Sequence, residues 1–307
     1  MSRVAWIFPG QGSQHVGMGK DLFDQYGSVR ALFNQASEIA GKDLAKLCFE
    51  GPEEDLIKTE NAQVGIFLVS AAVVNVLRES GQKPTYLAGH SLGELTAYYA
   101  AGVFDLATAI RLILARGAAM AASFPSEKSA MAAVMGLEPD KIVEVVKAFE
   151  PNAVVANFNS AGQLVISGEV AAVAEASEAL KTAGAKRLIP LKVSGAFHSP
   201  FMQNASDTFK QVIEPVVFDN ASAPIIINRT AEPETIADRL KENLPLQLKS
   251  SVKWMQSVSY LSGAVDLIVE CGPGKVLAGL VKKTAPDIEV QSLSDPAGIA
   301  EFLASRS

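Results

Sequence analysis

Hydrophobic and polar positions along this chain follow two periods that predict strands and helices in alternation. Short apolar runs predict strands at 4–8 and 86–89. Stretches with helical spacing predict helices at 29–40, 62–79, 92–101 and 105–121. Strands separated by helices form a mainly parallel sheet with helices on its faces. The first part of the chain is therefore expected to be an α/β domain.

The pattern changes after position 126. The predicted elements then follow the order β-α-β-β-α-β, which is the split βαβ arrangement of a ferredoxin-like domain. They are a strand at 131–135, a helix at 139–149, strands at 153–158 and 163–167, a helix at 170–183 and a strand at 187–192. We therefore expect a small ferredoxin-like domain inserted at 127–192.

The α/β pattern returns after the insertion. The predicted elements are a helix from 200, a strand at 224–227, helices at 234–243 and 252–261, a strand at 266–270, a helix at 274–283, a strand at 288–291 and a helix at 296–304. The large α/β-hydrolase-like domain is thus expected to be discontinuous, with residues 1–126 and 193–307. The cleft between the two domains is the expected site.

Composition and charge indicate which partners and which cellular compartment to expect. Apolar residues make up 49% of the chain, and the net charge of −6 gives no general basic surface for nucleic acid or anionic lipid. The apolar run at 64–77 is shorter than a membrane span needs, and the run at 4–8 is too short for a signal peptide. Cys48 and Cys271 lie far apart without metal-ligand spacing. We expect a cytoplasmic protein with no membrane or nucleic-acid partner.

A serine between two glycines is the first candidate for chemistry. Residues 87–94 read Leu-Ala-Gly-His-Ser-Leu-Gly-Glu, with a predicted strand before Ser91 and a predicted helix after it. Small neighbours let the chain turn sharply and hold the hydroxyl at a helix N-terminus, where backbone N–H groups favour developing negative charge. The segment predicts a nucleophile elbow.

A serine nucleophile needs a base, and the chain has three histidines. His90 adjoins the serine and is expected to point away from its hydroxyl, whereas His15 lies in a glycine-rich loop and could line the cleft. His198 precedes a predicted helix that Ser199 can cap and Pro200 can begin. By elimination His198 is the best base, and a loop histidine bonded only to backbone is the alternative.

No acidic residue is well placed to orient that histidine. Asp105 begins a predicted helix soon after the elbow, and Asp140 falls inside the predicted small domain. This favours a Ser–His pair whose imidazole is held by a backbone carbonyl or an amide.

The glycine-rich loop at 8–15, Phe-Pro-Gly-Gln-Gly-Ser-Gln-His, directly follows the first strand. It lacks the third glycine of a dinucleotide-binding loop, and Lys20 is followed by Asp21, so it does not match a P-loop. Such a loop can instead offer a backbone N–H to an oxyanion. Gln11 and Leu92, the residue after the serine, are the expected pair of donors.

Four segments together resemble the malonyl-CoA:acyl carrier protein transacylases of fatty-acid synthesis. They are Gly-Gln-Gly-Ser-Gln at 10–14, Gly-His-Ser-Leu-Gly-Glu at 89–94, Arg-Gly at 116–117 and Ala-Phe-His-Ser at 196–199. Asn-Phe-Asn at 157–159, Gln163 with Val-Ile-Ser-Gly at 165–168, and Glu-Cys-Gly-Pro-Gly at 270–274 extend the resemblance over essentially the whole chain.

The resemblance implies a role for each matching residue. Ser91 would be the acylated nucleophile and His198 its base, with the amides of Gln11 and Leu92 as the oxyanion hole. Arg116 would grip the malonyl carboxylate, and Asn159 would line the cleft. Gln247 would orient the histidine through its main-chain carbonyl. The chain departs from many members at Ser250-Ser251, in the loop near Gln247, and at Ala161, and neither departure touches a reacting group.

The resemblance also implies the reaction and the partners. Malonyl would pass from malonyl-CoA to the phosphopantetheine thiol of an acyl carrier protein by a ping-pong mechanism. No metal or redox cofactor is expected, and nothing in the sequence demands more than a monomer. An acidic carrier would dock on local positive charge, for which the candidates are Lys181, Lys186, Arg187, Lys192, Lys275, Lys282 and Lys283.

Three alternatives stay open. A free-standing acyltransferase of a polyketide synthase would have the same site and a different acceptor. A serine thioesterase or esterase would share the elbow and use water. A non-catalytic carrier-binding module would need none of these side chains.

Overall fold

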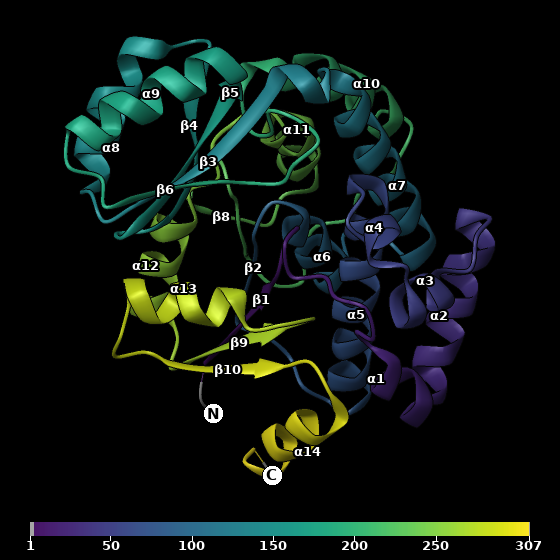
Figure 1. Cartoon of the computed structure of the whole chain (residues 1–307). Helices are drawn as coiled ribbons and strands as arrows, with labels where there is room; N and C mark the ends of the chain where they lie inside the picture. Colours follow the sequence, from purple (N-terminus) through teal and green to yellow (C-terminus); the bar gives the residue numbers. More distant parts are fainter. Residues whose placement is uncertain (1–2, 307) are drawn as a thin grey trace.

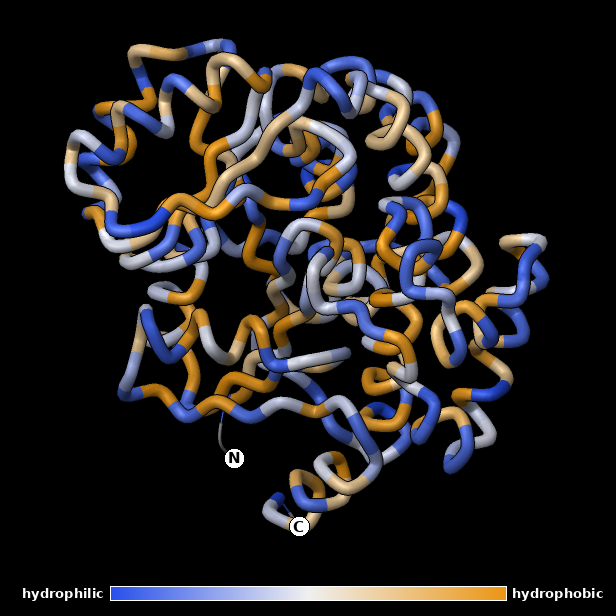
Figure 2. Tube along the Cα trace, viewed as in Figure 1, coloured by the Kyte–Doolittle hydropathy of each residue, from blue (hydrophilic) through white to orange (hydrophobic). Residues whose placement is uncertain are grey.

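Two β-sheets organise the chain, and helices cover both of them (Figure 1). The structure, a computed structural model, describes residues 3–306. Sheet A has the strand order β10-β9-β1-β2-β7-β8, and sheet B has the order β4-β5-β3-β6. Figure 2 shows hydrophobic positions concentrated along the strands, while the outer helices alternate between hydrophobic and hydrophilic positions.

Sheet A is parallel except at one edge. Its strands are β1 (Val4–Phe8), β2 (Tyr86–Gly89), β7 (Ile225–Ile226), β8 (Pro233–Glu234), β9 (Leu267–Cys271) and β10 (Glu289–Leu293). Only β8 runs antiparallel to its neighbour, β7. Phe8 lies opposite Gly89 in the pairing of β1 with β2, so the loops that follow these two strands leave the sheet side by side.

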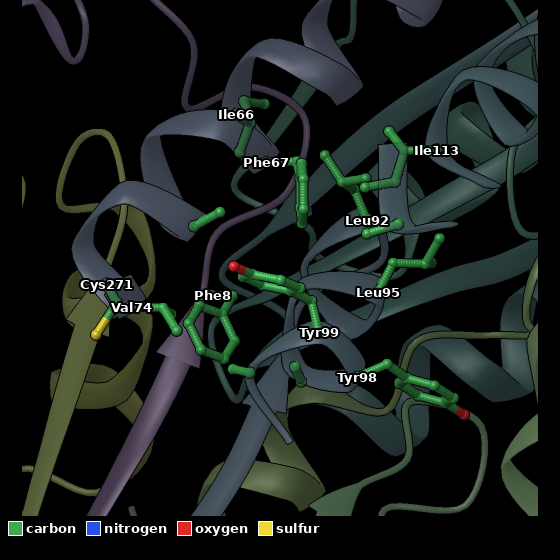
Figure 3. Packing of buried hydrophobic residues seen from close by; sticks show 14 of the residues in the cluster. Phe8, Ile66, Phe67, Val74, Leu92, Leu95, Tyr98, Tyr99, Ile113 and Cys271 are labelled. Carbon is green, nitrogen blue, oxygen red and sulfur yellow. The ribbon is translucent and has the colours of Figure 1, made fainter. Parts of the chain in front are cut away.

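Both faces of sheet A are buried, as expected of a parallel sheet covered by helices. Side chains of β1 alternate, so Val4, Trp6 and Phe8 belong to one core and Ala5 and Ile7 to another. The first core includes the helix α5 (Thr59–Glu79), and Figure 3 shows Phe8 close to side chains of α5 and α6. The second lies under α12 (Trp254–Ala264) and α13 (Val276–Thr284).

The remaining helices of this part surround the first core. They are α1 (Lys20–Gln25), α2 (Gly27–Ala40), α3 (Leu44–Glu50), α4 (Glu53–Leu56), α6 (Leu92–Ala100), α7 (Leu106–Ser123), α10 (Gln203–Ile213), α11 (Ala237–Gln247) and α14 (Pro296–Ala304). Of these, α6, α7 and α11 carry residues that meet at the candidate site.

Sheet B is antiparallel and has its own core. Its strands are β3 (Ser129–Met135), β4 (Ala153–Ser160), β5 (Gln163–Glu169) and β6 (Arg187–Pro190), with the helices α8 (Pro139–Val146) and α9 (Val170–Thr182) between them. The β-α-β-β-α-β order confirms the ferredoxin-like prediction, and sheet A confirms the mainly parallel α/β prediction.

Backbone hydrogen bonds tie the segment before α12 to sheet B, and Lys253 N of the same segment donates to Asn228 O, just after β7 of sheet A, at 2.8 Å. Val252 N donates to Ala156 O at 2.8 Å, and Phe158 N donates to Val252 O at 2.9 Å. The chain between α11 and α12 therefore runs along β4, the strand that carries Asn159.

Several boundaries differ from the sequence-based expectation. The short helices α1, α3 and α4 were not predicted, and the strand predicted at 187–192 ends at Pro190. The helix expected at 234–243 begins at Ala237, because Glu234 pairs with β7 and its carboxylate accepts the N–H groups of Thr235 and Ile236. Pro200 begins a 3-10 turn, but Ser199 does not cap it, since its hydroxyl donates to Ala196 O.

Two helices, α5 and α7, are long and apolar enough to cross a membrane by length and composition alone. In α5, 83% of the apolar window is buried inside the protein, as in a core helix; in α7 the share is 39%.

Candidate active site

The turn between β2 and α6 forms a strained elbow at Ser91, whose backbone has φ 51° and ψ −104°. The residues two positions before and after it must be glycine. A Cβ added to Gly89 would lie 1.9 Å from the carbonyl carbon of Gly93, and one added to Gly93 would lie 2.0 Å from Phe8 O. The turn therefore depends on the absence of a side chain at both of these positions.

The hydroxyl of Ser91 meets the imidazole of His198. Ser91 Oγ and His198 Nε2 are 2.7 Å apart, and His198 Nδ1 lies 3.1 Å from the carbonyl oxygens of both Gln247 and Ser250. A carbonyl oxygen can only accept, so Nδ1 carries the proton and Nε2 is free to accept one from the serine. The carbonyl of Gln247 thus lies where the resemblance expects it, and Ser250 adds a second acceptor.

The imidazole is buried beside a positive charge. His198 is 4% exposed. Burial first, and the Arg116 charge second, lower the pKa of His198 to about 3, against hydrogen bonds from its ring to Gln247 and Ser250 that favour protonation. The ring is therefore neutral at physiological pH, which is the form that can act as a base.

Arg116, on α7, is buried with neutral partners. Its Nη1 donates to Gln63 Oε1 at 2.8 Å, and its Nη2 donates to Gln247 Oε1 at 2.9 Å and to Ser91 Oγ at 3.1 Å. Among residues 3–306 no carboxylate forms an ion pair with it. Burial lowers the pKa of Arg116 to about 10, opposed by the charge of Glu94, so the guanidinium stays charged at neutral pH.

A cavity of about 470 Å³ opens onto these groups. Of the residues expected at the site, it is lined by Gln11, Ser91, Leu92, Arg116, Asn159 and His198. In the described part of the chain, the amide N–H groups of Gln11 and Leu92 have no hydrogen-bond acceptor. Two free donors therefore border the cavity next to the serine.

Gln247 supports the site from behind the cavity wall. Its carbonyl accepts from His198 Nδ1, its Oε1 accepts from Arg116, and its Nε2 donates to Ser91 O at 2.9 Å. One residue on α11 thus contacts all three of the groups that meet at the centre.

The other two histidines do not contact the serine hydroxyl. His90 lines the cavity and its Nε2 lies 2.8 Å from Asn159 Oδ1, so its ring engages Asn159 rather than the serine hydroxyl. His15 is exposed and is not among the cavity residues, so the expectation that it could line the cleft was wrong. Asp105 caps α7 by accepting from Thr108 N at 2.8 Å, so it does not act as a third catalytic member.

Two buried residues of the site were missed by the sequence analysis. Gln63 holds Arg116, and Asn228 accepts from Ser91 N at 2.7 Å. Neither stands in a short motif, and each comes close only through the packing of elements distant in the chain. In the described residues, no group of three or more histidine, cysteine, aspartate or glutamate side chains is arranged to hold a metal ion.

The serine lies in a sharp turn between a strand and a helix. An imidazole contacts its hydroxyl, and two free amides belong to residues that line the same cavity. This arrangement is typical of α/β enzymes that transfer acyl groups through a serine.

Comparison with known proteins agrees with this class. The acyl transferase domain family matches residues 5–294. The malonyl CoA-acyl carrier protein transacylase of Bacillus subtilis is 42% identical over 96% of this chain and 95% of its own length. The transacylase of Escherichia coli K12 is 39% identical over 99% of both chains. The chain therefore belongs to the acyl transferase domain family, within the group of malonyl CoA-acyl carrier protein transacylases.

Solved structures give the same result. An acyl carrier protein S-malonyltransferase from Vibrio cholerae superposes with a TM-score of 0.95 and 39% identity, covering 98% of this chain and all of its own. A malonyl-transacylase solved in complex with its type II PKS acyl carrier protein superposes with a TM-score of 0.96 and 37% identity, covering 99% of this chain and all of its own.

Proposed function

We propose that this protein transfers the malonyl group of malonyl-CoA to the phosphopantetheine thiol of an acyl carrier protein, in support of fatty-acid synthesis. Ser91 is the nucleophile and His198 the base. The amides of Gln11 and Leu92 form the oxyanion hole, and Arg116 binds the malonyl carboxylate. Asn159 lines the cleft, and Gln247 orients His198.

The position of Arg116 carries the proposal. In a malonyl thioester a single CH₂ separates the carboxylate from the reacting carbonyl, so the residue that binds the carboxylate must lie within a few ångströms of the nucleophile. Arg116 Nη2 lies 3.1 Å from Ser91 Oγ. Its charge is buried, and in residues 3–306 it lacks an anionic partner. A carboxylate that docks there is gripped by a charge-assisted pair.

The reaction then has two halves. His198 Nε2 takes the proton of Ser91 Oγ, which attacks the thioester carbonyl, and the resulting oxyanion is met by the two free amides. The C–S bond breaks, and the imidazolium returns its proton to the sulfur of coenzyme A. The carrier thiol then gives its proton to the same nitrogen and attacks the serine ester, and Ser91 recovers its proton as the ester bond breaks. Each half exchanges one acyl bond for another, so no metal or redox cofactor takes part.

The carrier docks at the mouth of the cavity. Leu191 and Lys192, just after β6, and Val276, on α13, line it. Exposed basic residues extend from there along both elements. Of the expected set, Lys181 is already ion-paired with Glu178 at 2.6 Å, so we assign the carrier contact to the others, foremost Arg187 and Lys283.

The chain is organised in two domains. Residues 127–192 form the small domain, and residues 1–126 and 193–307 form the large one, with the cavity between them. The protein acts as a cytoplasmic monomer without nucleic-acid or membrane partners. Its partners are malonyl-CoA and the acyl carrier protein.

The second candidate is the same reaction with a polyketide carrier as acceptor. The observation that favours it is the likeness to the transacylase solved with its type II PKS acyl carrier protein, which at 37% identity is nearly as similar as the relative from Escherichia coli. A hydrolase has less support, because a neutral ester has no charged group that the buried arginine beside the serine could bind.

The test is to incubate the protein with malonyl-CoA and a phosphopantetheinylated carrier of fatty-acid synthesis, and to follow carrier mass and free coenzyme A. Malonyl-carrier formed in step with coenzyme A supports the proposal. Coenzyme A released without malonyl-carrier would show hydrolysis instead. A polyketide carrier used many times faster would favour the second candidate.

A further inference from the structure

The elbow must be held in a conformation that a serine does not adopt readily. A positive φ is uncommon for a residue with a side chain, and it persists where surrounding groups fix it. The glycines at 89 and 93 make room for the turn, but they do not hold it. Hydrogen bonds to the backbone of the turn are needed for that.

Asn228 supplies such bonds on both sides of His90. Its Oδ1 accepts from Ser91 N at 2.7 Å, and its Nδ2 donates to Gly89 O at 2.6 Å. The strand register explains how it gets there. Ile226 of β7 lies opposite Ala88 of β2, so two residues later Asn228 comes level with His90. The carboxamide therefore spans the turn from the neighbouring strand.

Asn228 is itself fixed by the helix that follows the elbow. Its backbone N–H donates to Glu94 Oε2 at 2.5 Å, and its carbonyl accepts from Lys253 N at 2.8 Å. Glu94, on α6, is fully buried, and its second oxygen accepts from Asn243 Nδ2 at 2.9 Å. Glu94 N in turn donates to Ser91 O at 3.1 Å, which closes a ring from Ser91 through Asn228 to Glu94 and back.

We propose that Asn228 is the positioning residue that holds Ser91 in its reactive conformation, and that the buried carboxylate of Glu94 holds Asn228 in place. Asn228 is not among the cavity residues and does not reach the Ser91 hydroxyl, so it acts through the backbone. Because Ser91 N–H is bound to Asn228, the oxyanion is left to the amides of Gln11 and Leu92. The inference rests on the proposed acylation of Ser91.

The expected effect is on rate rather than on binding. In Asn228→Ala both bonds to the turn are lost, and Ser91 relaxes away from His198. A displacement of about 1 Å at a reacting group can cost about 100-fold in rate. We expect the single-turnover rate of Ser91 malonylation at saturating malonyl-CoA to fall about 100-fold. The KM for malonyl-CoA should change less than about threefold, since Arg116 and the cavity wall are untouched.

Two further variants make the test specific. Asn228→Asp has nearly the same shape and keeps the acceptor for Ser91 N–H, but it replaces the donor to Gly89 O by a second acceptor, so its rate should fall below that of wild type. Tyr99→Phe is the control, because it removes a hydrogen bond from α6, to Asn75 Oδ1 at 2.8 Å, without touching the elbow, Glu94 or Asn243. Melting temperatures of all three are measured alongside.

The experiment is rapid-quench malonylation followed by intact mass, at saturating and limiting malonyl-CoA. The inference holds if both Asn228 variants lose rate with little change in KM while Tyr99→Phe keeps the wild-type rate. It is overturned if Asn228→Asp, or a folded Asn228→Ala, acylates as fast as Tyr99→Phe at a similar melting temperature. If wild type itself forms no adduct, the proposed function fails, and this outcome is distinct from the other two.

Discussion

Nη2 of Arg116 lies 3.1 Å from the hydroxyl oxygen of Ser91. The group that would recognise the substrate's charge and the group that would attack its carbonyl are therefore hydrogen-bonded to each other before any substrate arrives. The same guanidinium contributes to the low pKa of His198. A carboxylate bound to Arg116 would offset that charge, so recognition and catalysis share one buried cation.

Replacing Arg116 should weaken the reaction with malonyl-CoA more than the reaction with acetyl-CoA. Arg116→Ala is expected to lose about 1.5–3 kcal/mol of malonyl recognition, the contribution of a charge-assisted pair, which is roughly 10- to 150-fold in kcat/KM. Acetyl-CoA, which has no carboxylate, should lose less, because only the contacts of Arg116 with Ser91 and Gln247 are missing for it. The comparison is kcat/KM for the two donors, with Arg111→Ala, an exposed arginine on the same helix, as control. Equal losses for both donors would rule out the assigned role.

The protonation state of His198 can be observed directly. Because its pKa is lowered to about 3, the ring should remain neutral, with the proton on Nδ1, at about pH 5.5. Protonation of His198 should then cause no loss of acylation rate as the pH falls from about 7 to 5.5, whereas a base with the ordinary pKa of about 6.5 would lose most of its activity. Burial raises the pKa of Glu94 to about 7, so any change of rate in this range belongs to that carboxyl. Imidazole ¹⁵N shifts, assigned with His198→Gln, report the tautomer. A doubly protonated ring at that pH would contradict this account.

The elbow should not tolerate a methyl group. Gly93→Ala places a Cβ 2.0 Å from Phe8 O, so backbone must move. We expect a loss of about 1–3 kcal/mol in the free energy of unfolding, and a fall of about 100-fold in acylation. Gly279→Ala, exposed on α13 with nothing within 4 Å of the new Cβ, should instead raise stability by about 0.5–1 kcal/mol. Denaturant melts separate the two, and similar effects would refute the steric argument.

Charge reversal on β6 and α13, the two elements next to the mouth of the cavity, should weaken only the second half-reaction. Arg187→Glu and Lys283→Glu are each expected to raise the KM for carrier several-fold at low salt, with the difference shrinking as salt screens it. The rate of acylation by malonyl-CoA should not change. Lys46→Glu, exposed on α3, serves as control because α3 lies apart from β6 and α13 (Figure 1). An equal rise in KM with Lys46→Glu would show that net charge is the cause and would contradict docking at these residues.

The parts of the site that follow from local chemistry could be predicted from sequence. Glycines around Ser91 fix a turn, and a strand before it and a helix after it fix where the turn lies. The β-α-β-β-α-β order of the inserted segment likewise predicted an antiparallel sheet, because each element is specified by its own periodicity.

The supporting residues could not be predicted in this way. Asn228 reaches the elbow through the register of β7 with β2, and the sequence marks neither that pairing nor the two-residue length of β7. Gln63 sits in an apolar helix where nothing sets it apart until α5 packs against α7 and brings it to Arg116. Both depend on contacts between residues more than fifty positions apart.

The central claim is that Ser91 carries the acyl group, and intact mass after brief mixing with malonyl-CoA, without carrier, tests it most directly. The account predicts one malonyl adduct that maps to the peptide containing Ser91, is absent in Ser91→Ala, and disappears when holo-carrier is added, with the carrier gaining the same mass. Transfer at the wild-type rate by Ser91→Ala, or an adduct on another residue, would contradict it.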